Sequence, residues 1–121
     1  MRGHAFLRRV VIDIDARVDA VAIVNTSFLS FGRAAAERYA KLITQSYADL
    51  AARPERPGAR VFEDDVYLYH LRWSRRTADA GERVGRPRHL VVYRYDVDSI
   101  QVLRLLHDRM DIGERIRSSG D

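Results

Sequence analysis

The spacing of apolar residues changes once along this chain, at Arg53-Pro54, and this change limits the architectures that the chain can form. Before this point apolar residues recur every three or four positions, which predicts two helices, Asp13–Leu29 and about Arg33–Ala52. The stripe of the first helix consists of Ile14, Val18, Val21, Ala22, Phe28 and Leu29. The stripe of the second consists of Ala35, Tyr39, Leu42, Ile43, Tyr47 and Leu50. Gly32 can end the first helix with a left-handed residue, so we expect an antiparallel helical hairpin.

Strands are predicted around this hairpin. Four segments have the alternation or composition of strands: Ala5–Ile12, Val66–Trp73, His89–Tyr95 and Ile100–His107. A tight hairpin over residues 96–99 joins the last two, and Asp108–Ile116 is expected to form a short final helix. We therefore expect an α+β fold of order β-α-α-β-β-β. The helical hairpin would cover one face of a mainly antiparallel, three- to four-stranded sheet, and the other face would stay open.

Composition excludes several classes of site. The 121 residues contain no cysteine, which removes disulfides, thiolate catalysis, zinc fingers and iron–sulfur clusters, and fits a cytoplasmic protein. The four histidines lack metal-ligand spacing, and no phosphate loop or dinucleotide fingerprint is present. No apolar run approaches the roughly 20 residues that span a membrane. We expect one domain, residues 1–121, with no metal and no cofactor.

The cations are almost all arginine. Of the 21 Lys and Arg residues only Lys41 is a lysine, and the net charge is +4. This charge is too small to predict direct nucleic-acid binding, but it suits an acidic protein partner, and a GC-rich genome also explains the arginine excess. The segment Ser74–Arg88, which includes Arg83, is expected to be an exposed loop that contains the densest cluster of arginines in the chain. The candidate residues for binding a partner protein are Arg72, Arg75, Arg76, Arg86, Arg88, Arg94 and Arg109.

Three segments resemble the ParE toxins of the RelE/ParE superfamily: Ser30–Tyr39, Arg88–Arg94 and Val102–Asp111, the last with the sequence LLHDRMD. The resemblance covers about residues 13–116, although residues 74–87 are longer than in most ParE toxins. It implies the toxin of a type II toxin–antitoxin system, which inhibits DNA gyrase by binding and is neutralised by a ParD-like antitoxin. We expect the antitoxin to dock on the hairpin Asp13–Ala52 or along the sheet edge.

A second activity within the superfamily is also open. Residues 73–76 (WSRR) resemble YoeB-type toxins, which, like RelE, cleave mRNA on the ribosome. A nuclease needs a base, an acid and cations around one phosphate, and here Arg88, His107 and Arg109 would have to converge. Lys41 lies in a helix, and no tyrosine follows Asp108. We therefore predict a gyrase binder rather than an enzyme, with the nuclease, or a degenerate toxin kept as a binding module, as alternatives.

Arg104 is predicted to have a structural role. It lies between Leu103 and Leu105 in a predicted strand, on the same side as Val102 and Leu106. An unpaired charge among apolar neighbours is costly, so we expect an ion pair or hydrogen bonds to this guanidinium.

Overall fold

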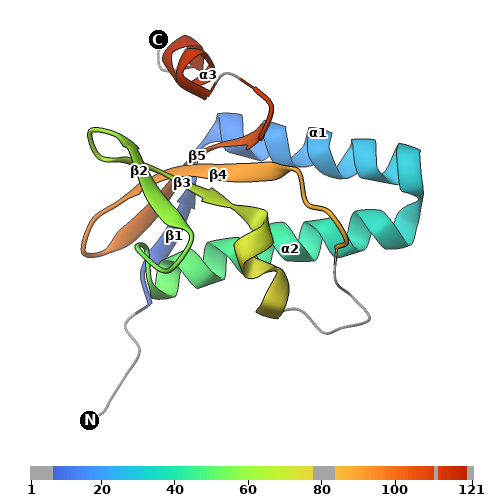
Figure 1. The fold of residues 1–121 in the computed structure, drawn as a ribbon, viewed down its shortest axis with the longest axis horizontal. Helices are drawn as coiled ribbons and strands as arrows, with labels where there is room; N and C mark the ends of the chain where they lie inside the picture. Colours follow the sequence, from blue (N-terminus) through green and yellow to red (C-terminus); the bar gives the residue numbers. More distant parts are fainter. Residues whose placement is uncertain (1–6, 78–83, 111, 120–121) are drawn as a thin grey trace.

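The computed structural model describes residues 7–77, 84–110 and 112–119. Its elements in chain order are β1 (Arg9–Ile12), α1 (Ile14–Phe31), α2 (Arg33–Ala52), β2 (Ala59–Glu63), β3 (Val66–His70), the 3-10 helix η1 (Leu71–Thr77), β4 (His89–Tyr95), β5 (Ser99–His107) and α3 (Ile112–Ser119). The strands form one sheet of order β1-β5-β4-β3-β2, in which β1 is parallel to β5 and the other neighbours are antiparallel (Figure 1). This confirms the α+β class and the helical hairpin.

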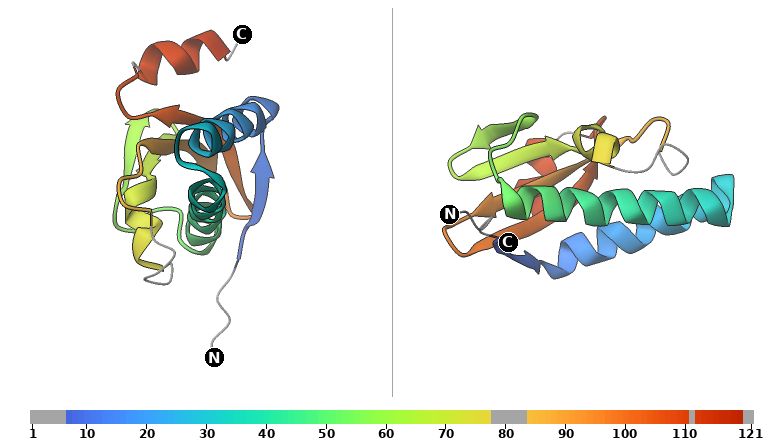
Figure 2. Two further views of the ribbon diagram at one scale, coloured as in Figure 1. Left: turned by 90° about the vertical axis from the view of Figure 1, so that its right-hand side faces the viewer. Right: turned by 90° about the horizontal axis from the view of Figure 1, so that it is seen from below.

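The second helix has the predicted limits, Arg33–Ala52. Gly32 has φ 91°, a positive value that favours glycine, and its N–H donates to the Phe28 carbonyl at 2.8 Å. The predicted stripe of α2, apart from the partly exposed Ala35, packs into the main core against Tyr69, Val91 and Tyr93 of the sheet. Figure 2 shows α1 and α2 running side by side along one face of the sheet.

The face of α1 that enters the core differs from the predicted stripe. Ile14, Val18 and Val21 are exposed, and the helix instead packs through Ala16, with Ala20, Ile23 and Val24 partly buried. Apolar residues surround most of this helix, so their spacing alone does not select the buried face. The stripe prediction for α1 is therefore wrong as a core prediction, and a row of apolar side chains faces solvent.

The opposite face of the sheet is covered in part. A second apolar cluster there consists of Val66, Leu68, Leu90, Val92 and Leu106. Ile112 and Ile116 of α3 pack against it, so the final helix begins later than predicted and covers surface that was expected to be open.

Two strand predictions are corrected. No strand was predicted for Ala59–Glu63, which forms the mostly exposed edge strand β2 and gives the described sheet five strands rather than the expected three or four. The predicted strand Val66–Trp73 ends at His70, where the chain turns into η1 and leaves Trp73 41% exposed. Among the described helices, none is long and apolar enough to cross a membrane.

A β-bulge in β5 changes which face of the sheet the side chains on either side of the bulge occupy. Val92 pairs with Arg104 and Tyr93 pairs with Val102, so one extra residue of β5 lies between the two pairs. As a result Val102 packs in the helix-side core while Leu106 packs in the cluster on the other face, so these two residues do not share a side as predicted. The predicted partner of Arg104 is confirmed: its Nε and Nη2 donate to the two carboxylate oxygens of Asp19 in α1, at 2.7 and 3.0 Å.

Candidate functional site

Three histidines meet at one end of the sheet. β3 ends at His70, β4 begins at His89 and β5 ends at His107, and the antiparallel register brings these three strand ends together. His89 pairs directly with His107, and their rings meet edge to face with centroids 5.2 Å apart. Of these three histidines, only His107 was expected from the sequence as a candidate reacting group. A histidine begins or ends two of the predicted strands, at His89 and His107, whereas His70 lay inside the predicted strand Val66–Trp73 and reaches a strand end only because β3 stops there.

Hydrogen bonds fix the histidine cluster, which consists of His70, His89 and His107. The Tyr39 hydroxyl lies 2.7 Å from His89 Nδ1 and accepts the Arg88 backbone N–H at 3.0 Å. Asp108 lies between the other two rings, 3.0 Å from His70 Nε2 and 3.4 Å from His107 Nδ1.

Burial and neighbouring charge tune this cluster. Burial, assisted by His107, lowers the pKa of His89 to about 4, so its imidazole is neutral near pH 7. Burial acts to raise the pKa of Asp108, but the hydrogen bond and charge of His70 outweigh it and hold that pKa below its usual value. The cluster therefore combines a neutral ring inside the fold with an ionised carboxylate at its outer edge.

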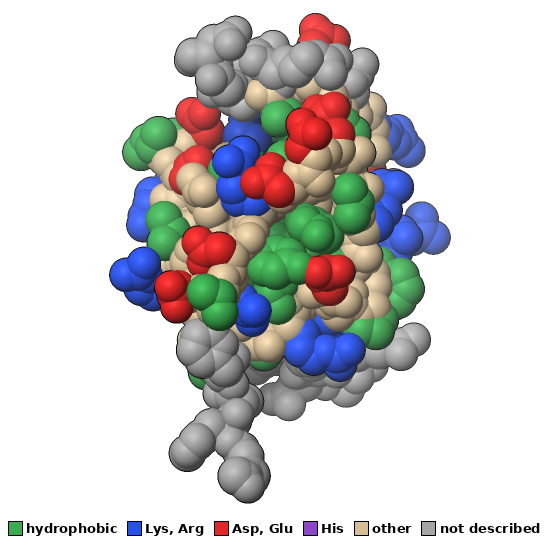
Figure 3. Space-filling view, turned by 90° about the vertical axis from the view of Figure 1, so that its left-hand side faces the viewer, with side chains coloured by type: hydrophobic (Ala, Val, Ile, Leu, Met, Phe, Trp, Pro, Cys, Tyr) green, Lys and Arg blue, Asp and Glu red, His purple; other side chains and the backbone are tan. Residues whose placement is uncertain are grey.

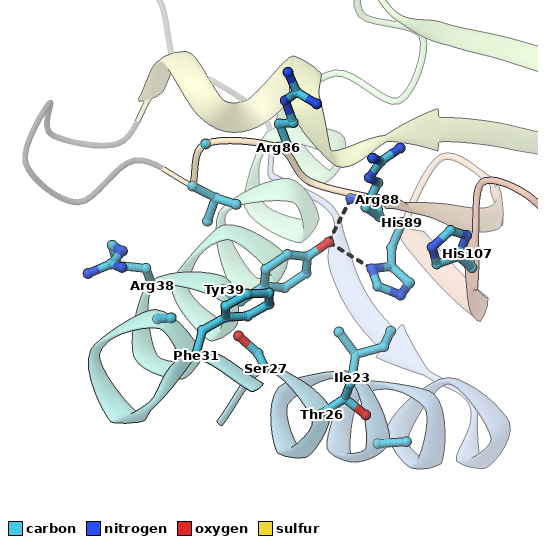
Figure 4. Close-up of a pocket in the computed structure, with 14 residues that line it drawn as sticks. Ile23, Thr26, Ser27, Phe31, Arg38, Tyr39, Arg86, Arg88, His89 and His107 are labelled. Atoms are coloured by element: carbon cyan, nitrogen blue, oxygen red, sulfur yellow. Dashed lines mark hydrogen bonds between the residues drawn. The ribbon is translucent and has the colours of Figure 1, made fainter. Parts of the chain in front are cut away.

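A pocket of about 720 Å³ opens beside these histidines. Its walls come from α1, from α2, from residues 84–88 and from the two strand ends (Figure 4). The described residues that line it are Ala22, Ile23, Thr26, Ser27, Phe31, Ala35, Arg38, Tyr39, Val84, Gly85, Arg86, Arg88, His89 and His107. None of these is an Asp or Glu, and in the described part of the chain no group of three or more potential ligands is placed to hold a metal ion.

The topology gathers most of the candidate arginines at the histidine end. Arg72 and Arg75 follow β3, Arg86 and Arg88 precede β4, and Arg109 follows β5. The Arg75 side chain is held by a hydrogen bond, in which its Nη1 donates to the Gly85 carbonyl at 2.7 Å. The Arg72 guanidinium lies over the Trp73 ring. Arg94 lies toward the other end of β4, while the side chain of Arg76 and all of Arg83 lie outside the described residues.

The opposite end of the sheet has a different charge pattern. The turns β2–β3 and β4–β5 lie there and carry exposed acids, Asp64 and Asp65 in the first and Asp96 and Asp98 in the second. Figure 3 looks onto this end, where acidic and basic side chains are interspersed around an apolar patch. An acidic partner would therefore be drawn to the histidine end rather than to the turns.

The residues named for a nuclease are brought together in part. Arg88 and His107 line the same pocket, joined there by His89 and Tyr39. Arg109 is exposed and is not among the described residues that line it, and its backbone N–H donates to His107 Nδ1 at 3.1 Å.

The apolar row on α1 is the largest exposed hydrophobic feature of the hairpin. Its members are Ile14, Val18, Val21, Phe28, Leu29 and Phe31, with exposed fractions from 50% to 78%. Val10 and Val11 of β1, an edge strand, are also exposed and directly precede it in the chain. A helix face and a free strand edge of this kind are typical of a protein-binding surface.

Comparison with known proteins places this fold. Residues 10–112 match the family described as the ParE toxin of the type II toxin-antitoxin system parDE. A solved structure described as the chromosomal ParDE TA system from P. aeruginosa aligns with a TM-score of 0.62 and 16% identity, over 84% of this chain and 97% of that one, which shows a shared fold. The search of curated proteins gave no match. Since the family match spans most of the chain, the protein belongs to the ParE toxin family of type II toxin–antitoxin systems.

Proposed function

We propose that this type II toxin component inhibits growth by binding DNA gyrase in the cytoplasm, and that a ParD-like antitoxin encoded by an adjacent gene neutralises it. The apolar row on α1 carries the antitoxin part of this proposal. Ile14, Val21 and Leu29 are each more than 70% exposed, on a helix whose one fully buried residue is Ala16. Burying one such side chain against a partner stabilises a complex by about 1.5–3 kcal/mol.

Charge supports the same partner. The arginines of the histidine end would attract an acidic antitoxin segment, while the apolar row would supply most of the affinity. A segment with one apolar face fits this row in the way that an amphipathic helix fits a groove.

The proposal that gyrase is the target rests on membership of the ParE family and not on the apolar row or the arginines described above. A toxin that acts by binding needs no acid–base pair, and inhibition should then depend on several residues of an interface rather than on one. The pocket that contains Arg88, His89 and His107 is the one observation that favours the alternative, a ribosome-dependent mRNA endonuclease.

Parallel assays distinguish these targets. We expect the purified protein to inhibit gyrase supercoiling and to leave ribosome-bound mRNA intact, and His107→Ala to keep most of the inhibition if it folds. Codon-positioned cuts by the wild type that disappear in His107→Ala or Arg109→Ala would instead identify the endonuclease.

Antitoxin docking is tested by Val21→Glu. The side chain is 71% exposed, so the fold should be stable to within about 0.5 kcal/mol, while affinity for the co-expressed antitoxin should fall at least about tenfold. Thr44→Glu, an exposed position on α2, is the matched control and should leave affinity unchanged. Equal affinity of Val21→Glu and wild type would remove the apolar row from the interface. Growth that is normal when the chain is expressed alone would remove the toxin proposal itself.

A further inference from the structure

The pocket beside the histidine cluster has two chemically different walls. One is apolar, with Ile23, Phe31 and Ala35 among its residues. The other is cationic or hydrogen-bonding and is made by Arg86, Arg88, His89 and His107, while Arg38 lies beside Phe31 of the apolar wall. Figure 4 shows Arg38 and Arg86 on different sides of the pocket and the two histidines next to each other. Such a combination suits a ligand that has both an apolar body and a polar group.

The charge of this pocket is unbalanced. Three of its described lining residues are arginines and none is acidic. Within the described part of the chain, no ion pair joins Arg38, Arg86 or Arg88 to a carboxylate. Asp108, the carboxylate at the outer edge of the histidine cluster, offsets part of this positive charge. The remaining positive charge attracts an anion, and a concave site concentrates this attraction.

The hydrogen bonds of the two histidines determine which nitrogens can donate. His107 Nδ1 accepts the Arg109 backbone N–H, so in the neutral ring the proton resides on Nε2. The Tyr39 hydroxyl can donate to His89 Nδ1 while its oxygen accepts the Arg88 N–H, and in this arrangement the proton of the neutral His89 ring is on Nε2. No hydrogen bond is formed by either Nε2 among the described residues. In this arrangement each of the two rings has an Nε2–H donor without a hydrogen-bond partner among the described residues.

From these observations we infer that the pocket binds an oxyanion on a small apolar body, such as an organic phosphate or carboxylate. The histidine Nε2–H groups and the Arg88 guanidinium hold the oxyanion, and the apolar wall of α1 and α2 contacts the body. Arg38 and Arg86 at the rim supply further positive charge. A volume of about 720 Å³ accommodates a ligand of the size of a mononucleotide.

Calorimetry with three probes tests this site directly. Phenyl phosphate carries the oxyanion on an apolar ring, inorganic phosphate carries the oxyanion alone, and phenol carries the ring alone. We expect phenyl phosphate to bind more tightly than either of the others in Tris buffer, and benzoate to show whether a carboxylate replaces the phosphate. Phenol that binds as tightly as phenyl phosphate, or phenyl phosphate that gives no heat at millimolar concentration, would overturn the inference.

Two variants locate the site. Arg88→Gln keeps the backbone N–H that Tyr39 accepts but removes the guanidinium, and should weaken phenyl phosphate about tenfold. Arg94→Gln removes an exposed guanidinium toward the other end of the same strand and should leave binding unchanged. Circular dichroism confirms folding of both, and equal weakening by both would reduce the effect to general surface charge and contradict a pocket. These measurements use neither gyrase nor antitoxin, so their failure is distinguishable from failure of the proposed function.

Discussion

The ion pair between Arg104 and Asp19 should be one of the stronger polar contributions to this fold. The two side chains are 18% and 15% exposed, and the hydrogen bonds of the bidentate pair measure 2.7 and 3.0 Å. Asp19 Oδ2 also accepts the backbone N–H of Leu105 at 3.0 Å. One carboxylate of α1 therefore joins the first helix to the last strand by three hydrogen bonds.

The expected loss in free energy of unfolding depends on which polar groups each substitution leaves without a partner. Asp19→Ala leaves a mostly buried guanidinium and the Leu105 N–H without their acceptor, and should lower the free energy of unfolding by about 3–4 kcal/mol. Arg104→Met keeps the volume and leaves Asp19 bound to that N–H, so we expect about 2 kcal/mol. The double variant should cost about as much as Asp19→Ala alone, which gives a coupling energy of about 2 kcal/mol.

Urea denaturation followed by circular dichroism measures all four proteins of this cycle. Arg94→Met, at an exposed position of β4, is the matched control and should change stability by less than about 0.5 kcal/mol. A coupling energy below about 0.5 kcal/mol would show that the pair stabilises nothing beyond its separate side chains. Arg104→Met that folds with unchanged stability but loses toxicity would show that the residue serves function instead.

Two further predictions concern backbone strain and acid stability. Gly58 has φ +101°, and a Cβ at this position would lie 2.4 Å from Trp73 Cγ. Gly58→Ala should therefore lower the free energy of unfolding, measured by urea denaturation, by about 3 kcal/mol. Gly32→Ala, whose Cβ would meet nothing within 4 Å, should lower it by about 1 kcal/mol. Equal losses would show that Trp73 moves aside freely. The lowered pKa of His89, about 4 against about 6.5 in an unfolded chain, means that the folded state binds fewer protons between these values. The free energy of unfolding should therefore fall as pH decreases from about 6.5 to about 4, and a pH series on His89→Gln should show a flatter slope; an unchanged slope would contradict the assignment.

Local signals in the sequence determined the helical hairpin and the hairpin turn between β4 and β5. Gly32 and Pro54 set the two ends of α2, because each residue restricts the backbone within a few positions. The buried face of α2 was predictable because its large apolar residues lie on one side of the helix. The LLHDRMD segment at the end of β5 was sufficient to suggest the family. The need of Arg104 for a partner was also evident from its apolar neighbours.

Tertiary structure decided which groups meet. Asp19 lies 85 residues from Arg104 in the chain, and only the packing of α1 on β5 identifies it as the partner. The histidine cluster depends on strand register, and the sides of Val102 and Leu106 depend on one bulged residue. The exposed row of α1 depends on how that helix rotates on α2 and β5, because apolar residues surround most of it. Spacing along a chain reports periods of a few residues, whereas register, rotation and long-range pairing are set by the free energy of the assembled core.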